Sequence, residues 1–306
     1  MSQAFSSSSV SVITVTYNSA DMLTGLLDSL RPALSDVRQY QVFVADNLSR
    51  DASADLAQKH QIAPTVVQTG RNAGYAAAIN MALDLVDHAD AVLVLNPDVR
   101  LSPGAVGTML AKLDAEGVGI VAPKMLHNDG TLSFSIRKEP SILSAWSEAL
   151  IGGTLASRIG LGEVVRNPRH YEGRFPLEWA TGAALLISPA ARRAVGRWDE
   201  SYFLYSEEVD YMRRVRAAGY SIVYAPDAPA IHFGGESNEN SNLYALLTTN
   251  RIRYFQRCHG RLASAAFRAG VIAGEALRAA CGGRTHQSAL RAALALPDAN
   301  SFIGQG

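Results

Sequence analysis

Two groups of acidic residues in this sequence have the types and spacing needed to bind a metal ion and to move a proton. The first is Asn96-Pro97-Asp98, which follows an apolar run. Because Pro97 has no N–H for a strand ladder, we expect the strand to stop there and to leave Asp98 at its carboxyl end, where open α/β sheets bind ligands. A carboxylate there can hold Mg²⁺ or Mn²⁺ against a diphosphate, since phosphates and water supply the other oxygen ligands. For an isolated Asn-Pro-Asp the alternative is a plain surface turn.

The second group brings Glu207, Glu208 and Asp210 into four residues after an aromatic run. Acids in the first turn of a helix are stabilised by the helix dipole, which accounts for one or two of them. Like charges packed this closely raise one another's pKa, which suits a general base that takes a proton from a hydroxyl group. We therefore predict that one of these three acids is a general base.

Further candidates stand at the ends of other expected strands. Asp46 and Asn47 end the second strand, where a carboxylate accepts the N3–H of a pyrimidine base or simply caps the turn. Arg71 and Asn72 precede a helix start, which suits either a phosphate site or an ordinary helix cap. His232 follows a strand and precedes two glycines, so it either completes a metal shell or is an ordinary histidine.

Strand and helix patterns alternate through the first third of the chain. We expect strands at residues 10–16, 42–47, 65–68 and 91–95, and helices at 20–30, 53–58 and 75–86. This alternation with short connections predicts a doubly wound α/β fold with a mostly parallel sheet.

The pattern changes after residue 103. We expect helices at 105–115, 189–195 and 207–218, strands at 119–123, 178–188 and 221–224, and a hairpin at 125–135 around Asn-Asp-Gly. Residues 137–176 are rich in Gly, Arg and Pro, with an amphipathic piece at 146–151. We interpret this segment as an insertion over the site.

The composition excludes several classes of protein. The 306 residues are 48% hydrophobic and 18% charged, with a formal net charge of zero, which argues against a nucleic-acid binder. Cys258 and Cys281 fit neither a disulfide framework nor a zinc site, which favours a reducing cytoplasm. Residues 1–9 form a polar tail without the features of a signal peptide, and no run of eighteen apolar residues predicts a transmembrane helix.

The order of these motifs resembles that of family 2 glycosyltransferases with a GT-A fold, and most of all the bacterial rhamnosyltransferase branch. The resemblance covers roughly residues 10–240. It rests on residues 14–18 (Thr-Val-Thr-Tyr-Asn), 44–47 (Val-Ala-Asp-Asn), 70–75 (Gly-Arg-Asn-Ala-Gly-Tyr), 96–98 (Asn-Pro-Asp), 181–184 (Thr-Gly-Ala-Ala), 198–200 (Trp-Asp-Glu), 207–210 (Glu-Glu-Val-Asp) and His232.

The resemblance implies a role for each matching residue. Asp98 and His232 would be the metal ligands, and Glu208 would lead Glu207 and Asp210 as the base. Glu208 stands where the family has an aspartate, and Asn96 replaces the first acid of the family's Asp-x-Asp. The implied donor-binding residues are Thr16, Tyr17, Asn18, Asp46, Arg71, Asn72, Asn96 and Asp98, and the implied acceptor-side residues are Trp179, Thr181 and Gly182.

The implied protein is an inverting, metal-dependent glycosyltransferase of α/β GT-A fold. We expect a nucleotide-binding half at 10–103, an acceptor half at 104–240 and a helical C-terminal extension at 241–306. The donor would be dTDP-rhamnose or a UDP-sugar, the cofactor Mg²⁺ or Mn²⁺, and the acceptor a saccharide or polyprenyl-linked sugar of bacterial cell-surface polysaccharide synthesis.

Two other functions stay open. A sugar-nucleotide pyrophosphorylase would share the sheet, but residues 17–20 (Tyr-Asn-Ser-Ala) lack its Gly-rich phosphate loop. A non-catalytic nucleotide-sugar-binding protein is the other alternative, and the retained acid cluster argues against it.

The C-terminal extension carries the one strong charge bias in the chain. Eight arginines and one acid, Glu275, lie between Arg251 and Arg291, at helical spacing with apolar residues. This pattern is typical either of a solvated helix face or of a peripheral contact with an anionic membrane, here the inner face of the plasma membrane. A homodimer contact is a further alternative.

Overall fold

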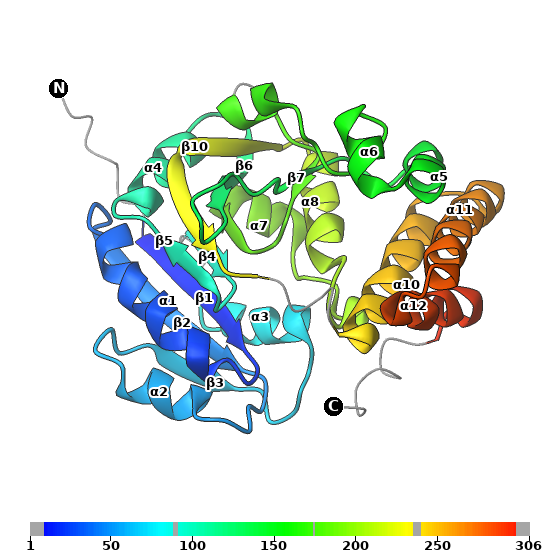
Figure 1. The fold of residues 1–306 in the computed structure, drawn as a ribbon. Coiled ribbons are helices and arrows are strands. Elements are labelled where there is room, and N and C mark those ends of the chain that lie inside the picture. The colour runs from blue at the N-terminus through cyan, green and yellow to red at the C-terminus, as the bar shows by residue number, and fades with distance from the viewer. Residues whose placement is uncertain (1–8, 88–90, 174, 235–239, 298–306) are drawn as a thin grey trace.

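The computed structural model describes residues 9–87, 91–173, 175–234 and 240–297, and its centre is one eight-stranded sheet (Figure 1). The strand order is β3-β2-β1-β4-β9-β6-β10-β5. The first-third strands are β1 (Ser9–Thr16), β2 (Gln39–Asp46), β3 (Thr65–Gln68) and β4 (Ala91–Leu95), and their helices are α1 (Ala20–Ala33), α2 (Ser53–Lys59) and α3 (Tyr75–Leu83). These four strands pair in parallel, so the predicted doubly wound half is confirmed.

The second half extends the same sheet beyond β4. Its helices and strands are β5 (Val99–Leu101), α4 (Ala105–Leu113), β6 (Val118–Leu126), β9 (Ala184–Ile187), α7 (Pro189–Val195), α8 (Glu207–Ala217) and β10 (Ser221–His232). Strand β9 runs antiparallel between β4 and β6, and β5 runs antiparallel to β10. Because β6 and β10 are parallel, the carboxyl end of β10 reaches the same sheet edge as that of β4.

Three expected strands differ from the structure. The strand expected at 221–224 runs on to His232 as β10. The strand predicted at 178–188 is split into β8 (Trp179–Ala180), which pairs with β7 (Ile136–Arg137), and β9. The break follows Thr181, whose N–H still donates to the Ser135 carbonyl beside β7, and pairing with β4 begins at Ala184. Strand β6 also continues past Pro123, where we expected it to end. The ladder to β10 shifts register beside Pro123, so the missing N–H falls at an irregularity.

Alternating apolar residues of the central strands supply two cores, one on each face of the sheet. Val12 joins a core with α1 and α4, whereas its neighbour Ile13 joins a core with α3, α7 and α8. The resulting layers of helix, sheet and helix are visible in Figure 1. The predicted class, a mostly parallel α/β sheet flanked by helices, is confirmed.

The insertion between β7 and β8 contains α5 (Ile142–Ile151), α6 (Gly153–Arg158) and the short 3₁₀ helix η1 (Pro168–Glu172), and the extension contains α10 (Ser241–Cys258), α11 (Arg261–Ala280) and α12 (Arg284–Ala295). Helices α5 and α6 form a separate group with the helices at the end of the chain, whereas η1 packs on the sheet through Tyr171. Phe255 and Phe267 stack with ring centroids 4.0 Å apart in a small core of this group. The expected C-terminal helices are therefore present.

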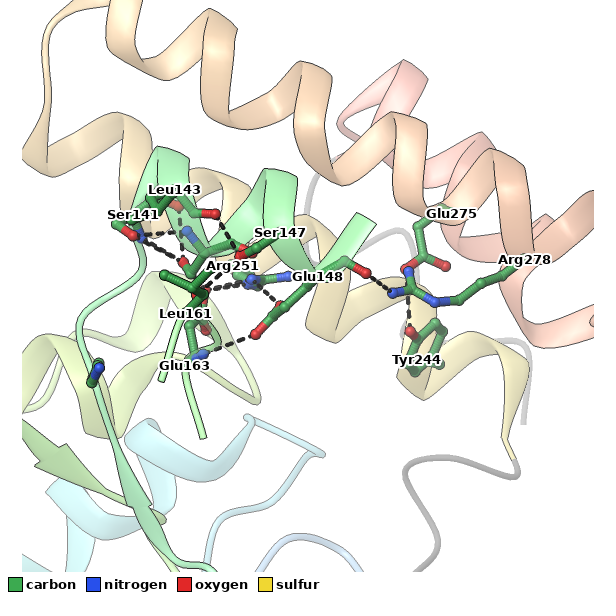
Figure 2. A network of polar contacts seen from close by, with 12 residues as sticks. Ser141, Leu143, Ser147, Glu148, Leu161, Glu163, Tyr244, Arg251, Glu275 and Arg278 are labelled. Carbon is green, nitrogen blue, oxygen red and sulfur yellow. Dashed lines mark hydrogen bonds and ion pairs between the residues drawn. The ribbon is translucent and has the colours of Figure 1, made fainter. Parts of the chain in front are cut away.

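A half-buried arginine attaches the extension to the insertion. The Arg251 guanidinium of α10 lies between Glu148, 2.9 Å away, and Glu163, as Figure 2 shows. Burial alone would lower the pKa of Arg251, but the two neighbouring carboxylates raise it more, so the net shift is upward. No described helix is long and apolar enough to cross a bilayer.

Candidate active site

Asp98 and His232 meet at the carboxyl edge of the sheet. Strand β4 ends at Leu95, and the Val99 N–H donates to the Asn96 carbonyl, so the chain turns before β5 pairs with β10. His232 Nε2 lies 3.2 Å from Asp98 Oδ2, and the Gly234 N–H donates to the same oxygen at 3.1 Å. Burial raises the pKa of Asp98, but the bond and charge of His232 outweigh it and hold that pKa below its usual value.

The contacts of Asp98 fit a shared metal site. Asp98 Oδ1 is buried and has no hydrogen-bond partner in the protein. Among the described residues, no three His, Cys, Asp or Glu side chains gather into a complete metal cage. A site of one carboxylate and one imidazole suits a cation that takes its remaining ligands from a diphosphate and water, as Mg²⁺ does.

The acid cluster opens α8 after a tightly bent loop. Phe203, Tyr205 and Ser206 all have positive φ, at 64°, 69° and 74°, so the backbone turns sharply into the first helical turn. The carboxylates of Glu207 and Glu208 each have a buried Oε2 atom without a partner. This loop therefore brings two carboxyl groups to one place, each with one oxygen atom left without a partner.

The three acids of the cluster have different surroundings. Burial raises the pKa of Glu207 well above its usual value, and the charge of Glu208 adds to the rise. Burial also raises the pKa of Glu208. Asp210 instead forms an ion pair with Arg214 Nε at 2.8 Å, one helical turn away. Among the three, Asp210 is the one whose carboxylate is held by an ion pair within α8.

Tyr75, the first residue of α3, links the two groups of acids. Its hydroxyl donates to Asn96 Oδ1 at 2.7 Å, and its N–H donates to the Phe203 carbonyl at 2.6 Å. Burial raises the pKa of Tyr75 well above its usual value, and the charges of Glu207, Glu208 and Asp98 raise it further. The Asn96–Asp98 turn and the acid cluster therefore converge on one site.

The acceptor-side residues predicted from the sequence line the start of α8. A Cβ atom added to Gly182 would lie 3.1 Å from Glu208 Cβ, so the glycine leaves the space that Glu208 occupies. Trp179 is anchored by a hydrogen bond from its indole N–H to the Lys138 carbonyl at 2.8 Å. The neighbouring Thr181 is held by its backbone bond to Ser135.

Among the predicted donor-binding residues, Asp46 and Thr16 each have a buried side-chain oxygen without a hydrogen-bond partner in the protein. Asp46 is 2% exposed, its Oδ2 accepts the Ser49 N–H at 3.2 Å, and its Oδ1 has no partner. The Thr16 hydroxyl is also buried without a partner. Asn47 has a positioning role, because its amide donates to the Gly74 carbonyl at 3.1 Å and accepts the Ala73 N–H.

The sequence model of "Glycosyl transferase family 2" matches residues 11–168. An N-acetylglucosaminyl-diphospho-decaprenol L-rhamnosyltransferase of Mycobacterium tuberculosis is 31% identical over 237 residues, which are 74% of this chain and 76% of the relative. The chain belongs to glycosyl transferase family 2. Its relatives make it rhamnosyltransferase-like, as the order of its motifs predicted.

Two further comparisons agree with this assignment. The rhamnosyltransferase WbbL of Escherichia coli K12 is 23% identical over 256 residues, 81% of this chain and 93% of the relative. The solved mannosyltransferase PcManGT of Pyrobaculum calidifontis, in complex with GDP-Man and Mn²⁺, has a TM-score of 0.59 at 17% identity and covers 96% of this chain and 81% of its own. At that identity the likeness shows the fold, which is of the GT-A type.

For four residues predicted to bind the donor, the contacts in this structure do not test that role. Asn18 has a φ of 52° and accepts the Arg50 N–H at 2.8 Å, so its side chain holds the neighbouring loop. Tyr17 and Arg71 are exposed, and Asn72 is half-buried. Their roles in binding the donor stay predictions.

Asn250 of α10 is a site residue of the glycosyltransferase that the sequence reasoning missed. Its amide is fully buried and donates to the carbonyls of Tyr202 at 2.6 Å, Leu204 at 2.8 Å and Tyr205 at 3.3 Å. These carbonyls belong to the bent loop before Glu207. The extension thus holds the acid cluster in place, and the helical pattern around Asn250 carried no signal of this long-range contact.

A cavity of about 450 Å³ lies between α5, α10 and α11, and it contains none of the predicted donor or acceptor residues. Its charged side chains satisfy one another: Glu275 bonds to Tyr244, Arg278 and His286, and Arg251 pairs with Glu148. We interpret it as part of the packing of the extension.

Proposed function

We propose that this glycosyltransferase transfers a sugar with inversion, in a reaction that depends on a divalent metal. The observation that carries the proposal is that Tyr75 bonds both to Asn96, in the turn that contains Asp98, and to the loop before Glu208. These contacts bring a carboxylate suited to a metal and an acid with a buried, partnerless oxygen to one edge of the sheet. The donor is dTDP-rhamnose or a UDP-sugar. The acceptor is a saccharide, carried on a polyprenyl lipid, in cell-surface polysaccharide synthesis.

In this mechanism Glu208 takes the proton from the acceptor hydroxyl. The hydroxyl oxygen attacks the anomeric carbon as the bond to the nucleoside diphosphate breaks, so the configuration at that carbon inverts without a covalent enzyme intermediate. The raised pKa of Glu208 makes it a stronger proton acceptor than an exposed glutamate. Asp98 and His232 would hold Mg²⁺ or Mn²⁺, which when bound would supply positive charge for the departing diphosphate.

The proposed substrates are supported by the names of the relatives. The mycobacterial relative is named for a diphospho-decaprenol acceptor and for L-rhamnose, and the Escherichia coli relative is named a rhamnosyltransferase. With such a lipid-linked acceptor, the proposal includes a cytoplasmic enzyme that acts at the inner face of the plasma membrane. The homodimer and the membrane contact of the C-terminal extension stay predictions.

The two rival functions make different predictions. A pyrophosphorylase needs a phosphate loop after β1, but here the Ser19 N–H donates to Ser53 Oγ at 2.9 Å and the Ala20 N–H donates to Asp51 at 2.9 Å. A non-catalytic binding protein would bind the nucleotide sugar and turn nothing over.

A donor screen by thermal shift, followed by a transfer assay, tests the proposal. We expect dTDP-rhamnose or a UDP-sugar to raise the melting temperature in the presence of Mn²⁺, because a ligand that binds only the folded protein stabilises it by mass action. The selected donor should then label N-acetylglucosaminyl-diphospho-polyprenol. Binding without transfer to any saccharide acceptor would favour the non-catalytic alternative. Conversion of the donor and added diphosphate into sugar 1-phosphate and a nucleoside triphosphate would favour the pyrophosphorylase.

A further inference from the structure

The outer face of α5 and α6 exposes large apolar side chains. In α5 these are Leu143, Trp146 and Leu150, at helical spacing and 61%, 37% and 68% exposed. Leu155 of α6 and Ile159 just after it continue the series at 49% and 56%. Single exposed leucines are common on soluble proteins, but a run of this kind on adjoining helices marks an interaction surface.

Helix α5 turns its small residues inward and its large residues outward. Ala145 and Ala149 pack against α11, where a Cβ added to Gly270 or Gly274 would lie 3.2 Å from the facing alanine Cβ. Close approach of the two helices uses these small side chains together with Trp146, whose indole lies over Gly270 and donates to the Ala266 carbonyl at 3.0 Å, whereas Leu143 and Leu150 stay exposed. The exposed leucines are not needed for the packing of α5 within the chain.

The charges of this segment favour an anionic lipid surface. Between residues 140 and 162 the only charged side chains are Glu148 and Arg158. Glu148 faces inward to Arg251 (Figure 2), whereas Arg158 is exposed, and the flanking Lys138 donates to the Gly160 carbonyl at 2.8 Å. The two flanking acids are paired within the protein, Glu139 with Arg216 and Glu163 with Arg251. The face is therefore apolar with Arg158 as its exposed charge, as expected for a helix that lies in the headgroup region of an anionic bilayer.

Several arginines of the C-terminal extension are engaged within the protein. Arg251 pairs with Glu148 and Glu163, Arg257 bonds to Asp199, and Arg268 donates to the Ala293 carbonyl at 2.9 Å. The charge bias of that segment thus serves largely to attach helices. We therefore favour α5 and α6, rather than the arginines of the C-terminal extension, as the surface that contacts a membrane.

We propose that residues 142–161 dock this glycosyltransferase on an anionic lipid bilayer. This docking rests on the proposed function. A lipid-linked acceptor keeps its reacting sugar near the bilayer, so an enzyme bound to the bilayer can reach it. Vesicle binding is measured without turnover, so the docking and the activity can fail separately.

Flotation with vesicles tests the docking. The protein should float with vesicles of phosphatidylcholine and phosphatidylglycerol, and less with phosphatidylcholine alone. We expect the triple variant Leu143→Gln, Leu150→Gln, Leu155→Gln to partition at least about 100-fold less, because three apolar side chains no longer leave water. The matched control Met22→Gln, Leu48→Gln, Leu85→Gln removes three exposed apolar residues of the nucleotide-binding half and should float like the unchanged protein.

Three results would overturn the proposal. The unchanged protein could stay unbound, the triple variant could float equally well, or binding could be lost only in Arg261→Gln, Arg284→Gln, Arg291→Gln, which would return the contact to the extension. A dimer in sedimentation that only the Leu143, Leu150 and Leu155 variant dissociates, with no flotation, would make the face a contact between copies. If the triple variant has a lowered melting temperature, flotation of the single variant Leu150→Gln is compared with that of the single control Leu85→Gln.

Discussion

Tyr75 shows at the scale of single residues how two chemical groups are brought together. The Tyr75 hydroxyl bonds to Asn96, in the same turn as the proposed metal ligand Asp98. The charges of Glu207 and Glu208 also act on this hydroxyl. Gly74 makes this possible: at a φ of 90° it packs so closely that a Cβ would lie 2.5 Å from the Phe203 carbonyl. The sequence motif around Tyr75 was recognised, but only the tertiary contact reveals its linking role.

The base assignment predicts a specific loss in Glu208→Gln. Glutamine cannot accept the proton, so we expect transfer to slow by about 10²–10⁴-fold while donor binding is kept. Since only ionised Glu208 accepts a proton and its pKa is raised, the rate of the unchanged enzyme should fall as the pH decreases toward that raised pKa. Asp210→Asn is the control, because Asp210 pairs with Arg214. If Asp210→Asn or Glu207→Gln shows a comparable loss of rate while Glu208→Gln stays active, the general base is that neighbouring acid and not Glu208.

Glu207 should make the folded protein less stable as the pH rises. Its folded-state pKa is raised by burial and by Glu208, so ionisation is more costly in the folded than in the unfolded state. Stability is therefore full below the unfolded pKa and declines as the pH rises toward the folded one. In urea unfolding, Glu207→Gln should be more stable than the unchanged protein at neutral pH, with little difference near about pH 4. Equal stabilities at both pH values would contradict the burial of an unpaired acid.

At the scale of helices and strands, the loop before α8 depends on a helix from the other end of the chain. Asn250→Ala removes the donor that holds three loop carbonyls. We expect kcat to fall by roughly 10²-fold with the donor KM nearly unchanged, since small displacements of a catalytic group cost about that much. Thr249→Val is the matched control, because the Thr249 hydroxyl bonds only to Ala245 of its own helix. An equal loss in both variants would indicate general damage to α10.

The elements also show which parts of the fold a sequence pattern predicts. Strands β3 and β4 lie where the alternation placed them, because local periodicity and turn residues determine buried parallel strands. The run at 178–188 was predicted as one strand, since both parts are apolar and only pairing with β7 separates them. The outward face of α5 was equally hidden, because burial of its alanines depends on distant glycines of α11.

At the scale of the whole molecule, the half-buried Arg251 couples the extension to the insertion. Arg251→Met leaves Glu148 and Glu163 without their cation. Breaking a fully buried pair costs about 3–5 kcal/mol of unfolding free energy, and we expect a loss near the lower end of that range because the Arg251 side chain is 23% exposed. Part of this loss should be recovered at low pH, because burial already raises the pKa of Glu163 and a protonated acid carries no charge. Arg291→Met, an exposed arginine of α12, is the control for urea denaturation. A loss as small as in the control would mean that the pair does not join the two parts.

The most direct test of the account is the metal dependence of sugar transfer in the unchanged enzyme and in Asp98→Asn. The measurement is the initial rate of label transfer from the selected nucleotide sugar to the lipid-linked acceptor during a Mn²⁺ titration, after treatment with chelator. We expect no transfer in excess chelator, recovery with Mn²⁺ or Mg²⁺, and no recovery in Asp98→Asn, whose melting temperature should match the unchanged enzyme. Full activity in excess chelator, or in Asp98→Asn, would contradict a metal-dependent site at the end of β4.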